Sequence, residues 1–329
     1  MLAIRVDVHG GPEVLRPVTV PEPTPGPGEV VVRHEAIGVN FVDAQHRAGS
    51  PYPVHLPLVP GIEAAGNVVE IGEGVQRCRP GDRVAYAGPM VGAYAELATV
   101  PEELVVGLPT GISASSAAAV LLQGMTAHVV THDVYTPVAG QSGLVHAGAG
   151  GTGWLIVQFL MAAGVRVIAT ASSDEKADAL RSLGVADVIV SRRSDVAEAV
   201  RRLVPGGVDV VFDSVGRATF ETSLRAVRPK GTVVAFGQSS GPVPPMDVAR
   251  LSGLTGEGLP GSVWLTWPTL LDYNAGRAAL ETRAADVFDA VLNGTLTPVV
   301  AETIPLVDAE RAHRLLDERK VVGKILLNP

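Results

Sequence analysis

The first third of the chain consists of short runs of β-branched residues separated by glycine and proline. Runs of strand length occur at residues 30–33, 67–71 and 83–86, and turn-forming segments such as Pro25-Gly26-Pro27-Gly28 lie between them. Short β-branched runs bounded by turn residues are typical of strands. Long helical periodicity is scarce before about residue 113. The pattern predicts a small, barrel-like β domain.

A different pattern begins near residue 113 with an alanine-rich helix start, and it becomes a regular alternation between about residues 142 and 237. Apolar strands are expected at 143–146, 165–169, 188–190, 208–212 and 232–236, with one helix ending at 163 and others at 175–183 and 196–203. Strands that alternate with helices of this length form a parallel sheet covered on both faces. The pattern therefore predicts an α/β domain with a doubly wound parallel sheet.

The tail returns to proline-rich loops, with helices expected at 277–292 and 309–318 and a last strand at 324–327. We expect this strand to rejoin the first domain. A chain of 329 residues exceeds what one hydrophobic core usually organises. We therefore predict two domains, the first formed by residues 1–122 together with 262–329 and the second by residues 123–261.

Composition and charge disfavour several classes of function. The formal net charge is −8 and the pI is about 5.5. This acidic balance disfavours a broad binding surface for nucleic acid or for an anionic membrane. Cys78 is the only cysteine, so neither an intrachain disulfide nor a cysteine-rich zinc site can form. The most apolar stretch, 154–171, is interrupted by Gln158, Gly164 and Arg166, and it predicts a helix followed by a strand rather than a membrane span. We expect a cytoplasmic protein.

The sharpest motif is the glycine turn Ala147-Gly148-Ala149-Gly150-Gly151-Thr152-Gly153. It follows an apolar strand and opens an apolar helix, and Gly148, Gly150 and Gly153 have the spacing G-x-G-x-x-G. In this context the glycines allow a tight turn, a close approach of the backbone to a pyrophosphate, and close packing of helix on strand. The free N–H groups of the helix start would face the phosphates. The motif predicts a dinucleotide site.

The residues after the second strand of this series indicate which dinucleotide binds. NAD enzymes usually carry Asp or Glu at that strand end, and here it reads Thr170-Ala171-Ser172-Ser173. Asp174 and Glu175 come next and suit the first turn of a helix. Ser172, Ser173, Lys176 and Arg192 would then surround a 2′-phosphate, which favours NADPH; the alternative is that all of them are ordinary surface residues.

With these motifs in place, the chain resembles the medium-chain dehydrogenase/reductase superfamily and, within it, the quinone oxidoreductase (zeta-crystallin-like) family. The segments that carry the resemblance are 38–43 (GVNFVD), 60–66 (PGIEAAG), 80–84 (PGDRV), 92–96 (GAYAE), 122–128 (LQGMTAH), 146–153 (HAGAGGTG), 213–216 (DSVG), 236–242 (FGQSSGP) and 319–327. The resemblance implies a Rossmann domain inserted in a GroES-like, β-barrel-type catalytic domain, with the active site in the cleft between them.

The resemblance also implies where zinc ligands would lie in alcohol dehydrogenases. A cysteine ligand falls where Asn40 stands, a histidine ligand falls where Ile62 stands, and residues 121–123 contain neither residue type. A catalytic zinc needs three converging protein ligands. The chain therefore resembles the metal-free branch, and we expect no metal.

Carried over by position, the resemblance assigns the cofactor residues. Asn40 and Thr126 would face the nicotinamide, and Gly150, Gly151 and Thr152 the pyrophosphate. Lys176 would reach the 2′-phosphate, and Lys324 would lie near the adenosine. The cofactor path would be lined by Ser214, Phe236 and Ser239. The chain departs from common family residues at Gln45, Ser191 and Trp267.

Without a metal, catalysis would depend on holding the dihydronicotinamide against an acceptor. Candidate catalytic groups are Asn40, Tyr52 and Gln123, whereas Asp43 fits a structural hydrogen bond better. The expected activity is NADPH-dependent reduction of a quinone or an α,β-unsaturated carbonyl. Alternatives that the resemblance leaves open are an enoyl or alkenal reductase and a non-catalytic, NADPH-linked RNA-binding protein.

The apolar run Val263-Trp264-Leu265 follows the nucleotide domain. If it forms the edge strand of the sheet, it needs a cover. In relatives that edge pairs with its symmetry mate, so we expect a homodimer.

Overall fold

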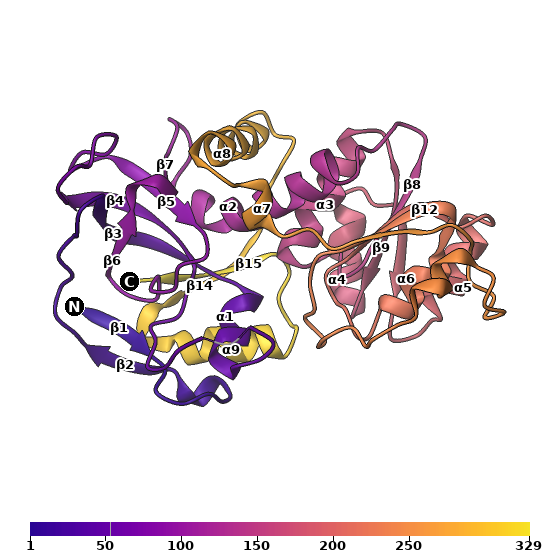
Figure 1. Ribbon diagram of the computed structural model, residues 1–329, viewed down its shortest axis with the longest axis horizontal. Coiled ribbons are helices and arrows are strands. Elements are labelled where there is room, and N and C mark those ends of the chain that lie inside the picture. Colours follow the sequence, from indigo (N-terminus) through magenta and orange to yellow (C-terminus); the bar gives the residue numbers. More distant parts are fainter. Residues whose placement is uncertain (53) are drawn as a thin grey trace. The chain divides into compact units, whose positions relative to one another are not determined.

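The computed structural model describes residues 1–52 and 54–329 and divides into two compact units. Unit 1 comprises Met1–Met125 and Tyr273–Pro329, and unit 2 comprises Thr126–Asp272. Figure 1 shows strands and helices in both units. The mixed α/β fold predicted from the sequence is confirmed.

Within the described residues, the main sheet of unit 1 has seven strands, with the order β14-β15-β3-β4-β5-β7 and β6 paired to β3. The strands of unit 1 are β1 (Leu2–Arg5), β2 (Arg16–Thr19), β3 (Glu29–Val39), β4 (Glu63–Ile71), β5 (Arg83–Ala87), β6 (Leu97–Pro101), β7 (Val105–Gly107), β14 (Val300–Pro305) and β15 (Lys324–Asn328). β15 pairs antiparallel with β3. The C-terminal strand therefore rejoins the first domain, as predicted.

Helices α1 (Phe41–Ala48), α2 (Ala114–His128), α8 (Arg277–Leu292) and α9 (Ala309–Asp317) accompany this sheet, and α2 extends by three residues into unit 2. The sequence prediction missed α1. Its start is fixed by Asp43, whose carboxyl group accepts the backbone N–H of Asn40 at 2.8 Å. Its end is fixed by Gly49 in the left-handed conformation, with φ 74°. These local caps, rather than an apolar stripe, define an eight-residue helix.

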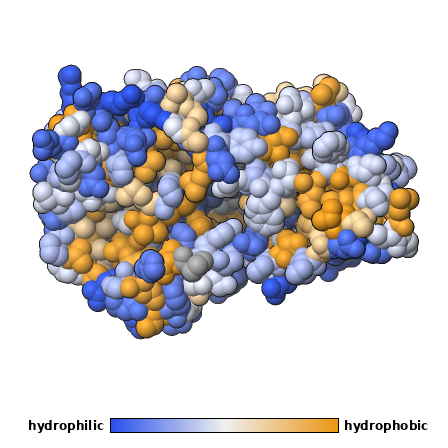
Figure 2. All heavy atoms as spheres, in the orientation of Figure 1, coloured by the Kyte–Doolittle hydropathy of each residue, from blue (hydrophilic) through white to orange (hydrophobic). Residues whose placement is uncertain are grey.

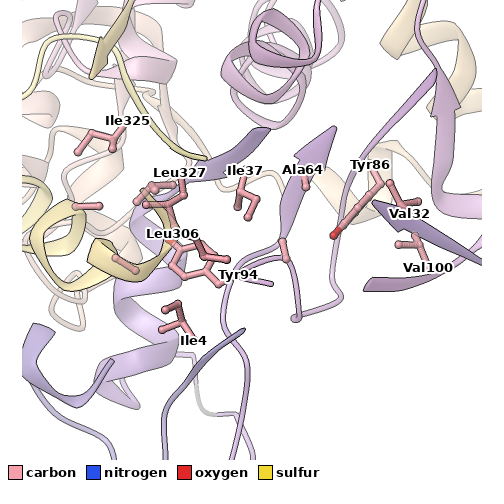
Figure 3. Packing of buried hydrophobic residues seen from close by; sticks show 14 of the residues in the cluster. Ile4, Val32, Ile37, Ala64, Tyr86, Tyr94, Val100, Leu306, Ile325 and Leu327 are labelled. Carbon is pink, nitrogen blue, oxygen red and sulfur yellow. The ribbon is translucent and has the colours of Figure 1, made fainter. Parts of the chain in front are cut away.

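The core of unit 1 lies where the C-terminal strand meets the N-terminal sheet. Figure 3 shows Ile325 and Leu327 of β15 near Ile37 of β3, with Tyr94 and Leu306 close by. Each of these five residues is at most 2% exposed. Burying such side chains is the main source of stability, so residues far apart in the chain form a single core.

Unit 2 contains, within its described residues, a six-stranded parallel sheet with the order β10-β9-β8-β11-β12-β13. Its strands are β8 (Ser142–Val145), β9 (Arg166–Ala171), β10 (Asp187–Val190), β11 (Val208–Asp213), β12 (Val227–Ala235) and β13 (Trp264–Thr266). Its helices are α3 (Gly151–Ala162), α4 (Asp174–Ser182), α5 (Val196–Leu203) and α6 (Phe220–Ala226), and the short α7 (Leu270–Tyr273) lies at the boundary. Counted from β8, the order is 3-2-1-4-5-6, that of a dinucleotide-binding fold. In Figure 1, α3 and α4 flank the sheet on one side and α5 and α6 on the other.

The second domain boundary differs from the predicted one. The sequence prediction placed residues 262–329 in the first domain, whereas β13 pairs parallel with β12 and residues 262–272 belong to unit 2. A three-residue strand after a long loop has too little pattern to reveal its partner. The other boundary, predicted after residue 122, lies after Met125 inside α2. No helix among the described residues is long and apolar enough to cross a membrane.

Candidate functional site

The glycine turn connects β8 to α3 at the carboxyl edge of the unit 2 sheet. A Cβ atom on Gly148 would lie 2.9 Å from the Cβ of Ala169, and one on Gly153 would overlap the carbonyl oxygen of Ala147. Gly150 is the N-cap residue of α3. The glycines therefore allow the helix start to lie close against the strands, with its first N–H groups lacking helical acceptors.

The turn is fixed to the neighbouring strand by two hydrogen bonds. The N–H of Ala147 donates to the Thr170 hydroxyl oxygen at 3.0 Å, and the N–H of Gly148 donates to the Thr170 carbonyl at 2.9 Å. Because both bonds come from β9, the turn and the end of β9 keep a fixed spacing. This spacing matters because the two segments would hold different parts of one dinucleotide.

The end of β9 carries no acidic residue. The strand ends at Ala171, and α4 begins at Asp174 after the N-cap Ser173, whose hydroxyl accepts the Lys176 N–H at 3.4 Å. Asp174 and Glu175 lie in the first turn of the helix, as predicted. Ser172, Ser173 and Lys176 therefore lie together at the end of β9, where a 2′-phosphate is predicted to bind.

Asp174 is neutralised by Arg193. The guanidinium group of Arg193 donates two hydrogen bonds to the Asp174 carboxylate, at 2.9 and 2.6 Å. β9 and β10 are parallel neighbours, and Ser191 bonds to Ala171, so the two loops lie side by side. The sequence predicts Asp174 in the first turn of a helix but does not reveal that it pairs with Arg193. Arg192 is exposed on the same loop.

Replacing Arg193 with alanine is expected to weaken NADPH binding about twofold to fivefold, because Asp174 would then repel the 2′-phosphate through a largely solvated path. NADH binding should stay unchanged. Fluorescence titration of both nucleotides checks this, with Arg181→Ala as the matched control, since Arg181 pairs with Asp178 on the same helix. Equal weakening of NADH and NADPH would contradict the assignment.

The third part of this edge is organised by Asp213 at the end of β11. Its buried carboxylate accepts the N–H groups of Val215 and Gly216 and the hydroxyls of Thr219 and Ser223. These bonds shape the loop that begins with Ser214. The Ser239 N–H donates to the Ser214 carbonyl at 3.3 Å, and the Phe236 N–H donates to the Asp213 carbonyl at 2.9 Å. The predicted cofactor-path residues thus follow adjacent strand ends.

The carboxyl edge of unit 2 fits a phosphorylated dinucleotide. The predicted residues that it brings together are Gly148, Gly150, Gly151, Thr152, Gly153, Ser172, Ser173, Lys176, Arg192, Ser214, Phe236 and Ser239. The helix start provides N–H donors for the pyrophosphate, and the cations near β9 suit a 2′-phosphate. Thr126 lies on α2, and its predicted role stays a prediction.

Unit 1 holds a buried ionic cluster around Asn40. The Lys324 ammonium donates to Glu63 Oε2 and to Asn40 Oδ1, both at 2.6 Å. Glu63 Oε1 accepts the Leu122 N–H at 2.7 Å, and the Gln123 amide donates to Asn40 Oδ1 at 3.4 Å. The side chains of Lys324 and Glu63 are 1% and 0% exposed. Two opposite charges are therefore held together inside an apolar domain.

This cluster corrects the prediction for Lys324. The resemblance assigned it to the adenosine side of the cofactor, but its ammonium is buried beside Asn40 and Glu63. Sequence reasoning also missed Glu63. Glu63 and Lys324 are each a charged residue beside an apolar run in a strand. Because a buried charge needs a partner, this pattern could have indicated that the two residues pair. Tyr52 is 39% exposed and makes no hydrogen bond to this cluster within the described residues, so its catalytic role stays a prediction.

A second group of buried polar side chains, linked by hydrogen bonds, lies next to Asn40. The Tyr94 hydroxyl donates to Asp43 at 3.1 Å and contacts His313 Nε2 at 2.9 Å, and the Arg47 guanidinium lies 3.0 Å from His313 Nδ1. Burial raises the pKa of Asp43 to about 7 and lowers that of His313 to about 3. Asp43 Oδ1 has no hydrogen-bond partner among the described residues. The structural bond expected of Asp43 is confirmed.

Metal-ligating side chains do not gather in the described parts of the chain: no group of three or more His, Cys, Asp or Glu residues could hold an ion there. Ile62 is buried and apolar, and Asn40 is bonded to Lys324 and Glu63.

Comparison with known proteins agrees with this geometry. Residues 26–110 match the alcohol dehydrogenase GroES-like domain model, and residues 151–275 match the zinc-binding dehydrogenase model. The chain is 40% identical to a quinone oxidoreductase of Pseudomonas aeruginosa over 99% of each chain. It is 38% identical to the 2-haloacrylate reductase of a Burkholderia species, over 100% of this chain and 99% of the relative. The crystal structure of Escherichia coli quinone oxidoreductase with NADPH superposes with a TM-score of 0.95 at 36% identity, covering 100% of both chains.

The chain belongs to the quinone oxidoreductase family of medium-chain dehydrogenases/reductases. Within this quinone oxidoreductase family, the three departures noted in the sequence lie at distinct places. Gln45 is on α1, Ser191 bonds to the end of β9 at 3.2 Å, and Trp267 follows β13 and is 45% exposed. Ser191 is thus the departure that lies beside the end of β9, where a 2′-phosphate is predicted to bind.

Proposed function

We propose that this protein is an NADPH-dependent reductase of quinones and related α,β-unsaturated carbonyls. The observation that carries the proposal is the corner at Ala171, where the acid typical of NAD enzymes is missing and the nearby Asp174 is paired with Arg193. The names of the P. aeruginosa and Burkholderia relatives support quinones and activated alkenes as acceptors. Bound NADPH would supply the hydride, and the chain's own residues would orient the cofactor and acceptor.

A panel of acceptors tests the proposal. Quinones, enones, 2-haloacrylates and saturated aldehydes are assayed with NADPH and with NADH. We expect NADPH-dependent reduction of at least one quinone or activated alkene and none of the aldehydes. Reduction confined to aldehydes, or no NADPH oxidation with any acceptor, would refute it.

We also propose that catalysis needs no zinc. Asn40, Ile62 and residues 121–123 offer none of the three ligands that a catalytic zinc requires. Elemental analysis of active protein should find well below one zinc per chain, and prolonged treatment with a chelator should leave quinone reduction within about 20% of the untreated rate, the range of ordinary assay error. Loss of activity that added zinc restores would contradict this.

We further propose a homodimer that covers the edge of the unit 2 sheet. β13 is the edge strand in the described residues, with Trp264 71% and Leu265 37% exposed. Figure 2 shows hydrophobic residues at several places on the face drawn, including its right-hand part. Exposed large hydrophobic side chains in the region are Val248, Leu254, Trp264, Leu265, Trp267 and Leu271. Open apolar strand edges tend to be covered by another chain.

Sedimentation at micromolar concentration should show a dimer for the parent and a monomer for Trp264→Glu, because a buried carboxylate at the interface would cost several kcal/mol. Val8→Glu is the matched control, since Val8 is 62% exposed in unit 1. A parent that sediments as a monomer would refute the dimer.

A cytoplasmic location stays a prediction. The chain has a single cysteine, so folding needs no oxidising compartment.

A further inference from the structure

The Asn40 side chain has no free hydrogen-bonding capacity. Its amide nitrogen donates to the Gly38 carbonyl at 3.2 Å and to Glu63 Oε2 at 2.9 Å, and its oxygen accepts from Lys324 at 2.6 Å and Gln123 at 3.4 Å. An asparagine amide has two N–H groups and two lone pairs on its oxygen. Asn40 is only 4% exposed. To orient an acceptor or a ribose itself, it would have to break an internal bond.

The orientation of this amide is fixed by chemistry. An ammonium only donates and a carboxylate only accepts, so Oδ1 of Asn40 must face Lys324 and Nδ2 must face Glu63. A flipped amide would place N–H against ammonium and oxygen against carboxylate. The buried Lys324–Glu63 pair therefore determines which atom of Asn40 faces Gln123.

Asn40 in turn orients Gln123. Because Asn40 presents an oxygen, the near end of the Gln123 amide must be Nε2, which donates across 3.4 Å. Gln123 is only partly buried, and within residues 1–52 and 54–329 its second N–H and its oxygen make no other hydrogen bond. Those two groups remain for a ligand.

We propose that Gln123 contacts the carbonyl oxygen of the acceptor, and that Lys324 and Glu63 are positioning residues that orient it through Asn40. This inference rests on the proposed reductase function. The remaining N–H of Gln123 donates to the oxygen of a quinone or an enone, and its Oε1 accepts the O–H of a reduced quinone. One side chain thus serves both the oxidised and the reduced form.

The test compares acceptor kinetics and binding in three variants. Gln123→Met removes the amide and keeps the length of the side chain. Glu63→Gln with Lys324→Met removes both charges together, because removing one alone would leave an unpaired buried charge and threaten folding. The third variant carries all three substitutions. Gln76→Met, at an exposed position, is the matched control.

The measurements are KM and kcat for 1,4-naphthoquinone, its dissociation constant from the NADP⁺ complex, and the dissociation constant of NADPH. Losing one neutral hydrogen bond should raise the naphthoquinone KM and dissociation constant about threefold to tenfold in Gln123→Met. The charge-pair variant should show a similar rise. NADPH affinity and the Gln76→Met constants should match the parent.

The triple variant decides whether the residues act as one unit. If Lys324 and Glu63 work through Gln123, its constants should equal those of Gln123→Met rather than the product of the two effects. Multiplying effects would overturn the positioning role, and parent-like constants in Gln123→Met would overturn the contact. A parent that neither binds nor reduces any quinone or enone would instead show that the proposed function has failed.

Discussion

Replacing Lys176 with alanine is expected to raise the dissociation constant of NADPH about tenfold to a hundredfold and to leave that of NADH nearly unchanged. A 2′-phosphate carries close to two negative charges. A charge-assisted contact to it contributes about 1.5–3 kcal/mol. Lys176 lies in the first turn of α4, directly beyond Ser172 and Ser173. Its ammonium can therefore swing back over the ribose as a mobile point charge.

The surroundings of Lys176 support this magnitude. Ala171 leaves the strand end without a carboxylate, and Arg193 pairs with Asp174, the first of the two acids, Asp174 and Glu175, that follow the serines. Because the Asp174 carboxylate is paired with Arg193, it competes less with a 2′-phosphate for the Lys176 ammonium. The salt dependence of binding gives a second measurement. If Lys176 contacts the phosphate, the NADPH dissociation constant should depend less on ionic strength in Lys176→Ala than in the parent.

Fluorescence titration of NADPH and NADH, each at low and high salt, checks the prediction. Lys176→Arg should keep most of the preference for NADPH, and Arg181→Ala, further along α4, should keep all of it. If the parent binds both nucleotides equally, or Lys176→Ala weakens both equally, the assignment of the 2′-phosphate corner is wrong.

The dinucleotide edge was largely predictable from the sequence because its parts are local. In a fold of this type, a glycine turn between a strand and a helix, and serines directly after the next strand, occupy the same positions at the edge of the sheet. Helix bounds at 196–203 and 277–292 were predicted to the residue. Because the strands are parallel, their carboxyl ends lie at one edge of the sheet, so the topology alone brings these distant turns together.

The cluster around Asn40 was not predictable in the same way. Lys324 and Glu63 are separated by 261 residues, and no sequence pattern around either residue indicates that the other is its partner. Their pairing depends on β15 lying beside β3 and β3 beside β4. Position-by-position transfer from relatives predicts that Lys324 lies near the adenosine, but its ammonium is buried against Asn40 and Glu63. A lysine at a given position can stabilise a core as well as bind a ligand.

The domain boundary near residue 262 shows a different limit of sequence-based prediction: a strand can be predicted while its partner strand cannot. The run at 263–265 was read correctly as an apolar edge strand, but its assignment to a domain required the pairing of Val233 with Leu265. Short strands are defined by their partners more than by their own composition.

The stability of the folded protein is expected to fall as the pH is lowered from about 6.5 to about 4, by about 1.4 kcal/mol per pH unit from its buried core groups. Burial lowers the pKa of His34 to about 4, and burial beside Arg47 lowers that of His313 to about 3. Burial holds both rings neutral. Arg47, 3.0 Å from Nδ1 of His313, adds to the effect there, whereas the Ala95 carbonyl, 2.7 Å from Nδ1 of His34, offsets only part of the effect of burial on the pKa of His34. Below about pH 6.5 the unfolded chain takes up two protons that the folded chain refuses, which favours unfolding.

Asp43 acts in the opposite direction. Burial raises its pKa to about 7, so between about pH 7 and pH 4 the folded chain holds a proton that the unfolded chain has lost, and acidification stabilises it. Two histidines against one carboxyl group leave a net of about one proton, which gives the slope of about 1.4 kcal/mol per pH unit. Burial also lowers the pKa values of His46 and His146, which act in the same direction, so the slope from all these groups is at least this steep.

Urea unfolding at half-unit steps from pH 4.5 to pH 7.5 measures this slope, and three variants assign it. His34→Gln should reduce the slope by about one proton, even if it lowers stability at pH 7, because the side chain no longer titrates in either state. Asp43→Asn should increase the slope by about one proton, since the opposing group is gone. His55→Gln, at an exposed position, should leave the slope as in the parent. A parent stability that is flat or rises on acidification over this range, or a steeper slope in His34→Gln, would show that the buried histidines are not the groups that resist protonation.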